Sequence, residues 1–168
     1  KNPGLEFTDI QPFVAYDRKG KVVGRIVGII NHRANEKWHT QNVRFGFIDF
    51  INDIEVTQLL LKAVEQWGRE RGMKYIQGPM GITDFDKEGM LVEGFEYIGS
   101  INTIYNFSYY PQHLESLGYE KEVDWVQIRI DIPQTTPKKY ARVAKLAKEM
   151  FHLRNKRLTA ADITRRGY

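Results

Sequence analysis

The stretch that decides the fold is residues 43–79, VRFGFIDFINDIEVTQLLLKAVEQWGRERGMKYIQGP. Residues 43–51 are rich in Phe and Ile and carry almost no charge, which is typical of a buried central strand. The apolar residues that follow recur at the spacing of one helix face. They are Val56, Leu60, Ala63, Val64 and Trp67. Residues 73–77 predict a second strand, so the whole stretch predicts a crossover unit with parallel strands.

Both ends of this predicted helix carry end signals. Asn52 is a suitable N-cap, and Glu55 three residues later completes a capping box. Gly72 suits the left-handed position just past the helix end, after Arg69 and Arg71 in its last turn. A helix that begins where a buried strand ends presents free backbone N–H groups, which can bind an anion. The alternative is a purely structural turn, since most such turns in α/β proteins hold no ligand.

The composition limits the possible classes of protein. At 168 residues the chain is one domain, or one domain plus part of another. No apolar run approaches the length of a membrane span and no signal-peptide pattern opens the chain, so we expect a cytoplasmic protein without a membrane partner. The absence of cysteine excludes disulfides, thiolate metal sites and thiol nucleophiles. The chain begins at Lys1 rather than at a methionine, and we expect it to pack against the rest of a longer protein.

Positive charge gathers near the C-terminus. Residues 137–168 hold ten Lys and Arg against two acids, whereas residues 1–136 hold fifteen against nineteen. This asymmetry predicts a domain over residues 1–134 and a basic helical extension over residues 135–168. A solvated helix face, or a link to an acidic partner domain, accounts for such charge. Nucleic-acid binding ranks last, because that function needs aromatic side chains interleaved with the charges.

The extension itself predicts several elements. Thr136 and Pro137 suit an N-cap and a first helical residue, and an apolar stripe follows them. The stripe consists of Tyr140, Val143, Ala144, Ala147, Met150 and Phe151. Leu158 is expected in a short strand, and Thr159 is expected to cap a last helix.

The segments that flank the central unit predict further structure. Residues 12–33 predict a β-hairpin, in which Gly24 and Gly28 mark a bulge or a close backbone approach. Residues 32–40 are polar and predict a mobile loop, and the spacing of its histidines does not suggest a metal site. Residues 123–132, VDWVQIRIDI, alternate apolar and polar side chains and predict a strand.

Residues 78–110 form the least regular segment, with many glycines but also many apolar side chains. A long irregular segment that still buries apolar groups is more often a binding loop than a spacer. Asp84, Asp86 and Glu88 alternate as in calcium loops, but the glycine and glutamate that complete such a loop are missing. No metal site is therefore predicted.

The order of these predicted elements resembles the GCN5-related N-acetyltransferase (GNAT) fold, and LESLGYEK resembles the family's leucine-glycine-aromatic turn. The motifs FGFIDFINDIEV, GMKYIQGP, EGMLVEGF and YNFSYYPQHLESLGYEK are similar to a bacterial acetyltransferase-like subgroup. The resemblance covers residues 5–132. It implies an α/β fold whose mixed, twisted sheet has helices on both faces.

The resemblance also implies a reaction, the transfer of an acyl group from acetyl-CoA or a longer acyl-CoA to a small-molecule amine. In the family the pantetheine arm pairs with the end of the central strand, and the pyrophosphate rests on the backbone of the following turn. Here those positions are Ile48, Phe50, Ile51, Asn52, Asp53, Ile54, Glu55 and Val56. The usual turn has a basic residue and two glycines, whereas Asp53 and Glu55 repel a pyrophosphate. The alternative is therefore a non-catalytic derivative that binds another small ligand or a partner domain.

The family's general acid is often a tyrosine four residues before the glycine of the turn, but Leu114 stands there in this sequence. Tyr109 and Tyr110 are candidates to protonate the departing thiolate, although both could simply pack at a helix entry. Asp49 and Glu93 are candidates to take the proton of the amine.

The amine substrate that the resemblance implies would be a cation, so we expect an acidic pocket that attracts it. Its candidate lining residues are Asp84, Asp86, Glu88, Tyr105 and Asn106.

Overall fold

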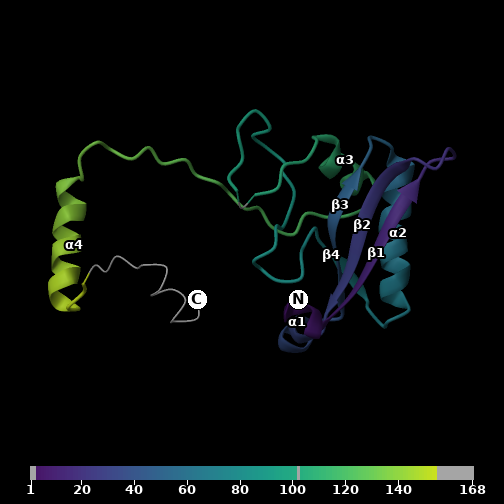
Figure 1. Ribbon diagram of the computed structural model, residues 1–168, viewed down its shortest axis with the longest axis horizontal. Helices are drawn as coiled ribbons and strands as arrows, with labels where there is room; N and C mark the ends of the chain where they lie inside the picture. Colours follow the sequence, from purple (N-terminus) through teal and green to yellow (C-terminus); the bar gives the residue numbers. More distant parts are fainter. Residues whose placement is uncertain (1–2, 102, 155–168) are drawn as a thin grey trace. The chain divides into compact units, whose positions relative to one another are not determined.

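The structure, a computed structural model, describes residues 3–101 and 103–154, and it divides into two compact units at residues 123 and 124. The first unit holds a four-stranded sheet with the order β1-β2-β3-β4. The strands are β1 (Thr8–Tyr16), β2 (Val22–Asn31), β3 (Asn42–Phe50) and β4 (Tyr75–Gln77). The first three strands are antiparallel neighbours and β4 lies parallel to β3, so the predicted mixed α/β fold is confirmed (Figure 1).

Four helices and one 3-10 turn accompany the sheet. They are η1 (Pro3–Glu6), α1 (His32–Trp38), α2 (Ile54–Arg69), α3 (Tyr109–Ser116) and, in the second unit, α4 (Lys138–Met150). The predicted loop over residues 32–40 is wrong, because α1 occupies it. The Asn31 side chain accepts a hydrogen bond from the Ala34 N–H and so caps this helix, and His39 ends it in the left-handed region at φ 54°.

Helix α2 covers one face of the sheet, and two glycines of β2 allow it to come close. A Cβ at Gly24 would lie 2.8 Å from Leu60 Cδ1, and a Cβ at Gly28 would lie 2.9 Å from Trp67 Cε3. The predicted close backbone approach at these glycines is confirmed. The core between helix and sheet consists of fully buried side chains, among them Ile26, Ile30, Phe45, Leu61 and Val64.

Part of the other face of the sheet, at the Asn31 end of β2, is covered by the irregular segment after β4. The Asn31 amide donates to the Ile82 carbonyl oxygen over 2.9 Å, and Ile82 is buried there. The Met80 N–H donates to the Phe45 carbonyl oxygen over 2.8 Å, which extends the pairing beyond β4. A Cβ at Gly46 would overlap the Met80 carbonyl oxygen, so only glycine fits at this position of β3.

Several predicted boundaries shift. The N-cap of α2 is Asp53 rather than Asn52, because the Asp53 carboxylate accepts from the Glu55 N–H over 2.9 Å. Glu55 therefore donates to the cap through its backbone and does not complete the predicted box. Helix α3 begins at Tyr109, two residues before the predicted start at Pro111. Gly72 adopts the predicted left-handed conformation at φ 77°.

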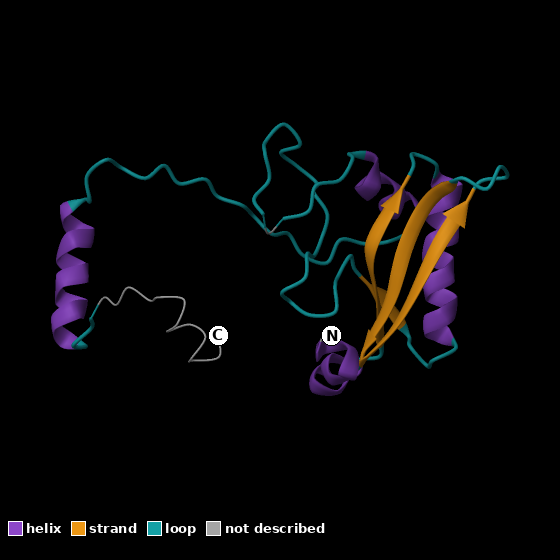
Figure 2. Cartoon of the chain, viewed as in Figure 1, coloured by secondary structure: helices purple, strands orange, loops and turns teal. Residues whose placement is uncertain are grey.

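The predicted strand over residues 123–132 is wrong, since these residues are a loop with exposed side chains (Figure 2). An isolated strand is not stable without a neighbour to accept its hydrogen bonds, and no second strand pairs with this segment in the described ranges. The expected helix near residue 137 is present as α4. The elements expected around Leu158 and Thr159 lie outside the described residues.

Candidate active site at the end of strand β3

Strand β3 changes its path before its carboxyl end. Phe47 is a non-glycine residue with a positive φ of 48°, and the register between β2 and β3 shifts between Arg25 and Val27. Such a bulge twists a strand locally and re-aims the side chains that follow it. Regular pairing with β4 ends at Arg44, so beyond the bulge one edge of β3 is open to α3.

Two tyrosines of α3 bind the last residue of β3. The Tyr109 hydroxyl donates to the Phe50 carbonyl oxygen over 2.7 Å. The Tyr110 hydroxyl accepts from the Phe50 N–H over 3.1 Å and donates to the Asp49 carboxylate. The Tyr110 ring is buried and stacks on the Phe50 ring with 4.0 Å between centroids. Three of the four predicted catalytic residues therefore meet at one point.

The fourth candidate, Glu93, does not join this group. Its side chain is exposed in the glycine-rich segment. No hydrogen bond or ion pair connects Glu93 to Asp49 or to either tyrosine within residues 3–101 and 103–154. The prediction of Glu93 as a base receives no support from this geometry.

The environment keeps both tyrosines protonated. Burial is the main cause that raises the pKa of Tyr110 far above its usual value, and its hydrogen bond to Asp49 adds to the effect. Burial, followed by the nearby Asp49 charge, raises the pKa of Tyr109. Each hydroxyl therefore keeps its proton through the neutral range.

His113 is a site residue that the sequence analysis did not single out. One turn after the tyrosines, its Nδ1 lies 2.7 Å from Thr57 Oγ1 and its Nε2 lies 3.0 Å from Asn52 Oδ1. The ring stacks on Phe50 at 5.6 Å, and Thr57 is fully buried. His113 thus ties α3 to the first turn of α2. The one available signal was its position three residues after Tyr110, which places both on one helix face.

The predicted pyrophosphate turn keeps its acidic character. The Asp53 carboxylate already accepts one N–H of the helix start, and Glu55 follows in the first turn. Neither Arg25 nor Arg44 pairs with these acids in the described part of the chain. The basic side chain that reaches the turn is His113, through Asn52.

A second group of charges gathers at the opposite end of β3. The pKa of Glu88 is raised, mainly by burial. The nearby charges of Asp84 and Asp86 also raise this pKa, and that of Arg44 lowers it. The Glu88 Oε1 atom is buried and has no hydrogen-bond partner among the described residues. Asp84 and Arg44 line a cavity of about 310 Å³, whose other walls include Trp38, Gln77 and Glu122. The three predicted acids are therefore neighbours, but only Asp84 lines the cavity, and the Asp86 carboxylate accepts from the Thr83 N–H over 2.9 Å.

The other two predicted substrate residues have structural contacts. The Asn106 amide donates to the Leu91 carbonyl oxygen and its oxygen accepts from the Leu91 N–H, so Asn106 clamps the loop as a neighbouring strand would. The Tyr105 hydroxyl donates to the Phe95 carbonyl oxygen over 3.0 Å. These bonds account for both side chains without a substrate.

The two groups are well separated along β3. Arg44 and Asp49 are five residues apart, which corresponds to about 17 Å along a strand.

Metal-ligand clusters and membrane-spanning helices are both absent from residues 3–101 and 103–154. No group of His, Asp and Glu side chains there could hold a metal ion. No helix within the same residues is long and apolar enough to cross a bilayer.

No family model matches the sequence. Over 135 residues the chain is 33% identical to Protein YghO of Escherichia coli (strain K12), covering 79% of this chain and 34% of that protein. Over 146 residues it is 28% identical to the bacterial ceramide synthase of Caulobacter vibrioides, covering 84% and 38% respectively. The chain thus spans little more than a third of the length of either curated relative.

Two solved structures are similar to the chain, and both carry the name of an acetyltransferase. One comes from Bacillus cereus, with a TM-score of 0.31, 18% identity, and coverage of 41% of this chain and 46% of that one. The other comes from Pyrococcus furiosus, with a TM-score of 0.44, 14% identity, and coverage of 75% and 69%.

Of the elements that carried the sequence resemblance, the hairpin, central strand, α2, parallel β4 and α3 are present in the predicted order, whereas the long strand expected after α3 is a loop. The chain therefore has a mixed α/β fold.

Proposed function

We propose that this chain is the acyl-transfer domain of an acyl-CoA-dependent N-acyltransferase. The observation that carries the proposal is the cluster of Asp49, Tyr109 and Tyr110 at the open edge of β3, directly before the start of α2. It combines a carboxylate that can take a proton with hydroxyls that can give one. Such a pair is what acyl transfer from a thioester to an amine requires.

In the proposed reaction the amine nitrogen attacks the thioester carbonyl carbon, the C–N bond forms and the C–S bond breaks. Asp49 is exposed and accepts the proton of the amine, while the hydrogen bond from Tyr110 orients its carboxylate. Tyr109 donates a proton to the departing thiolate and is reprotonated from solvent. To do so, its hydroxyl must first leave the Phe50 carbonyl oxygen.

The same bonds restrict where acyl-CoA could pair with the strand. Both polar backbone groups of Phe50 are already engaged by the tyrosines. Backbone groups alternate along a strand, so those of Ile48 face the same edge as those of Phe50. In the proposal Ile48 binds the pantetheine amide. The pyrophosphate would lie at residues 51–56, beside the His113 ring that contacts Asn52.

The proposed acceptor is a lipid amine. The name of the Caulobacter vibrioides relative, bacterial ceramide synthase, denotes a protein that makes an amide-linked lipid. A long amine also suits the separation between the acids near Arg44 and the cluster at Asp49. Its ammonium group could enter past Asp84 and Glu88, whose charges attract a cation.

A first experiment measures binding and turnover in the same protein. We expect acetyl-CoA or a long-chain acyl-CoA to raise the melting temperature in a concentration-dependent way, since a ligand of the native state stabilises it. Turnover with a sphingoid base is followed by a thiol reagent that detects free CoA, and the chain adds no background because it has no cysteine.

Three variants show which side chains act. Tyr109→Phe and Asp49→Asn should each lower the rate about a hundredfold or more, as expected for the loss of a general acid or base. Tyr105→Phe is the matched control, because Tyr105 also donates to a backbone carbonyl but lies outside the cluster. Equal losses in all three variants, or none in the first two, would contradict the assigned roles.

A second candidate function is a non-catalytic derivative that binds a different ligand. It is favoured by one observation: Asp53 occupies the helix start where a pyrophosphate would bind. In that case no CoA species shifts the melting temperature of the natural chain. The double change Asp53→Gly and Glu55→Gly should then create CoA binding, and no gain in affinity would count against this candidate.

A further inference from the structure

The apolar side of helix α4 is exposed within the part of the chain that the structure describes. The helix spans Lys138–Met150, and none of its residues is buried. Its large apolar side chains, with Phe151 directly after the helix, are between 47% and 68% exposed. They are Tyr140, Val143, Leu146, Met150 and Phe151. Their spacing of three and four residues places them along one side of the helix. Water alone is an unfavourable neighbour for a continuous stripe of this kind.

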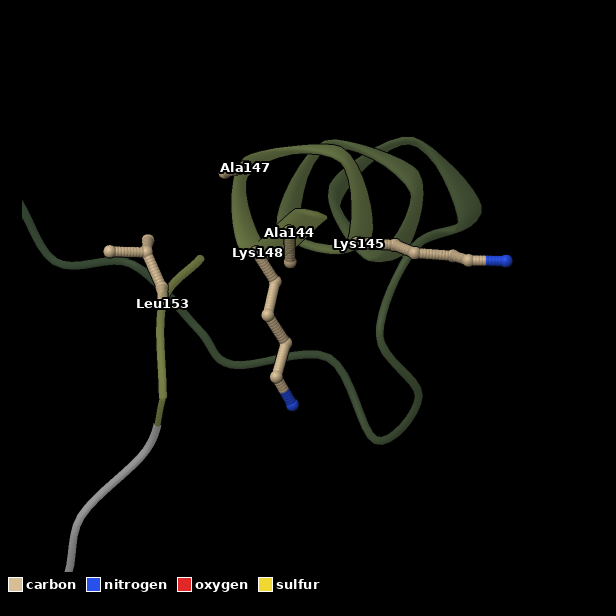
Figure 3. A pocket seen from close by; sticks show the side chains of 5 residues that line it. All are labelled: Ala144, Lys145, Ala147, Lys148 and Leu153. Carbon is tan, nitrogen blue, oxygen red and sulfur yellow. The ribbon is translucent and has the colours of Figure 1, made fainter. Parts of the chain in front are cut away.

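The rest of the helix surface is almost purely positive. Residues 138–150 contain five Lys and Arg and a single acid, Glu149. Figure 3 shows Lys145 and Lys148 extending from the helix in different directions, so they do not converge on one small anion. Charges spread in this way suit a surface that carries many negative groups.

We propose that α4, contrary to the expectation of no membrane partner, binds the surface of a membrane that contains anionic lipids, lying in the plane of the interface. The apolar stripe would enter the boundary between headgroups and acyl chains, and the basic residues would contact lipid phosphates. At 13 residues the helix is about 20 Å long, which is too short to cross a hydrocarbon core of about 30 Å. This inference concerns residues 138–151 alone and does not depend on acyl transfer.

The details of the helix fit this partner better than nucleic acid or an acidic protein. Tyr140 lies near the start of the stripe and Phe151 at its end, and aromatic rings favour the interfacial region. Nucleic-acid binding would use the positive face and leave the stripe in water.

The test uses the whole 168-residue chain and vesicles of two compositions. One is pure phosphatidylcholine and the other contains about 30% phosphatidylserine, which gives the surface a negative potential. Co-sedimentation should show binding to the anionic vesicles only. Neutralising Lys145 and Lys148 to glutamine should weaken this binding about thirtyfold, at roughly a fivefold effect for each basic residue.

The apolar stripe is tested separately. The double change Val143→Gln and Leu146→Gln should reduce binding to background, whereas Ala141→Gln, outside the stripe, should leave it unchanged. Depth is measured with Phe151→Trp, whose added fluorescence should be quenched by brominated acyl chains.

Each of three results would overturn the proposal. The first is no binding to anionic vesicles at low salt. The second is binding that the lysine substitutions weaken but the Val143 and Leu146 substitutions do not, with no quenching of the Phe151→Trp fluorescence. That result would indicate surface electrostatics without insertion. The third is the absence of vesicle binding together with a dimer in sedimentation analysis that dissociates when the stripe is substituted. That result would assign the stripe to contact with a second copy of the chain.

Discussion

The substitution Tyr110→Phe tests the cluster at the end of β3 most directly. It keeps the buried ring and its stacking on Phe50 but removes the hydroxyl. Two hydrogen bonds are lost, one donated to the Asp49 carboxylate and one accepted from the Phe50 N–H. The Phe50 N–H then has no partner in a buried position.

The magnitude follows from these two bonds. A hydrogen bond to a charged group contributes about 1.5–3 kcal/mol, but Asp49 is exposed and water can replace its partner, so the low end applies. An unsatisfied buried N–H costs about 1–3 kcal/mol. We therefore expect the free energy of unfolding to fall by about 2.5–4.5 kcal/mol. For a chain of this size each kcal/mol lowers the melting temperature by roughly 2–4 °C.

The assay is urea unfolding followed by circular dichroism, with Tyr105→Phe as control. The control loses one hydroxyl bond to a backbone carbonyl in an exposed loop, and we expect a change below about 1 kcal/mol. A Tyr110→Phe variant as stable as the control would refute the assigned hydrogen bonds. The Tyr110→Phe variant could also be less stable, with a loss of turnover that the fraction of unfolded protein fully explains. In that case Tyr110 does not orient Asp49 for catalysis.

Three further predictions concern other parts of the fold. Stability should decline as the pH rises above about 10, because folding raises the pKa of Tyr110 and Tyr119 and unfolding releases their protons; a Tyr119→Phe variant with the same alkaline slope as the natural chain would contradict this. Gly46→Ala should cost more than about 2 kcal/mol by urea unfolding, because its methyl group meets a backbone oxygen that cannot move aside. His113→Gln should weaken CoA binding, because it removes the ring that links α3 to Asn52 and Thr57 at the start of α2, and an unchanged melting-temperature shift with CoA would exclude this role.

Some residues of the candidate site could be predicted from the sequence and others could not. The difference lies in how far apart in the sequence the contacting residues are. Asp49 and Tyr110 are 61 residues apart, yet each was a candidate on its own, because one follows the central strand and the other opens a helix. Glu93 was a candidate for its charge alone, and nothing in its local sequence reported that it is exposed. His113 was missed because its role depends on Thr57, 56 residues away, which only the packing of α3 against α2 brings near.

The sequence by itself determined the hairpin, the central strand and helix α2, since their apolar periodicity records local burial that any correct packing must satisfy. The tertiary structure alone decided three other features. Helix α1 forms where polar composition predicted a loop, because Asn31 caps it. Residues 123–132 stay a loop although apolar and polar side chains alternate over most of their length, because a strand needs a neighbouring strand for its hydrogen bonds. The tyrosines engage the backbone of Phe50, because the bulge at Phe47 and the end of β4 pairing leave that edge open.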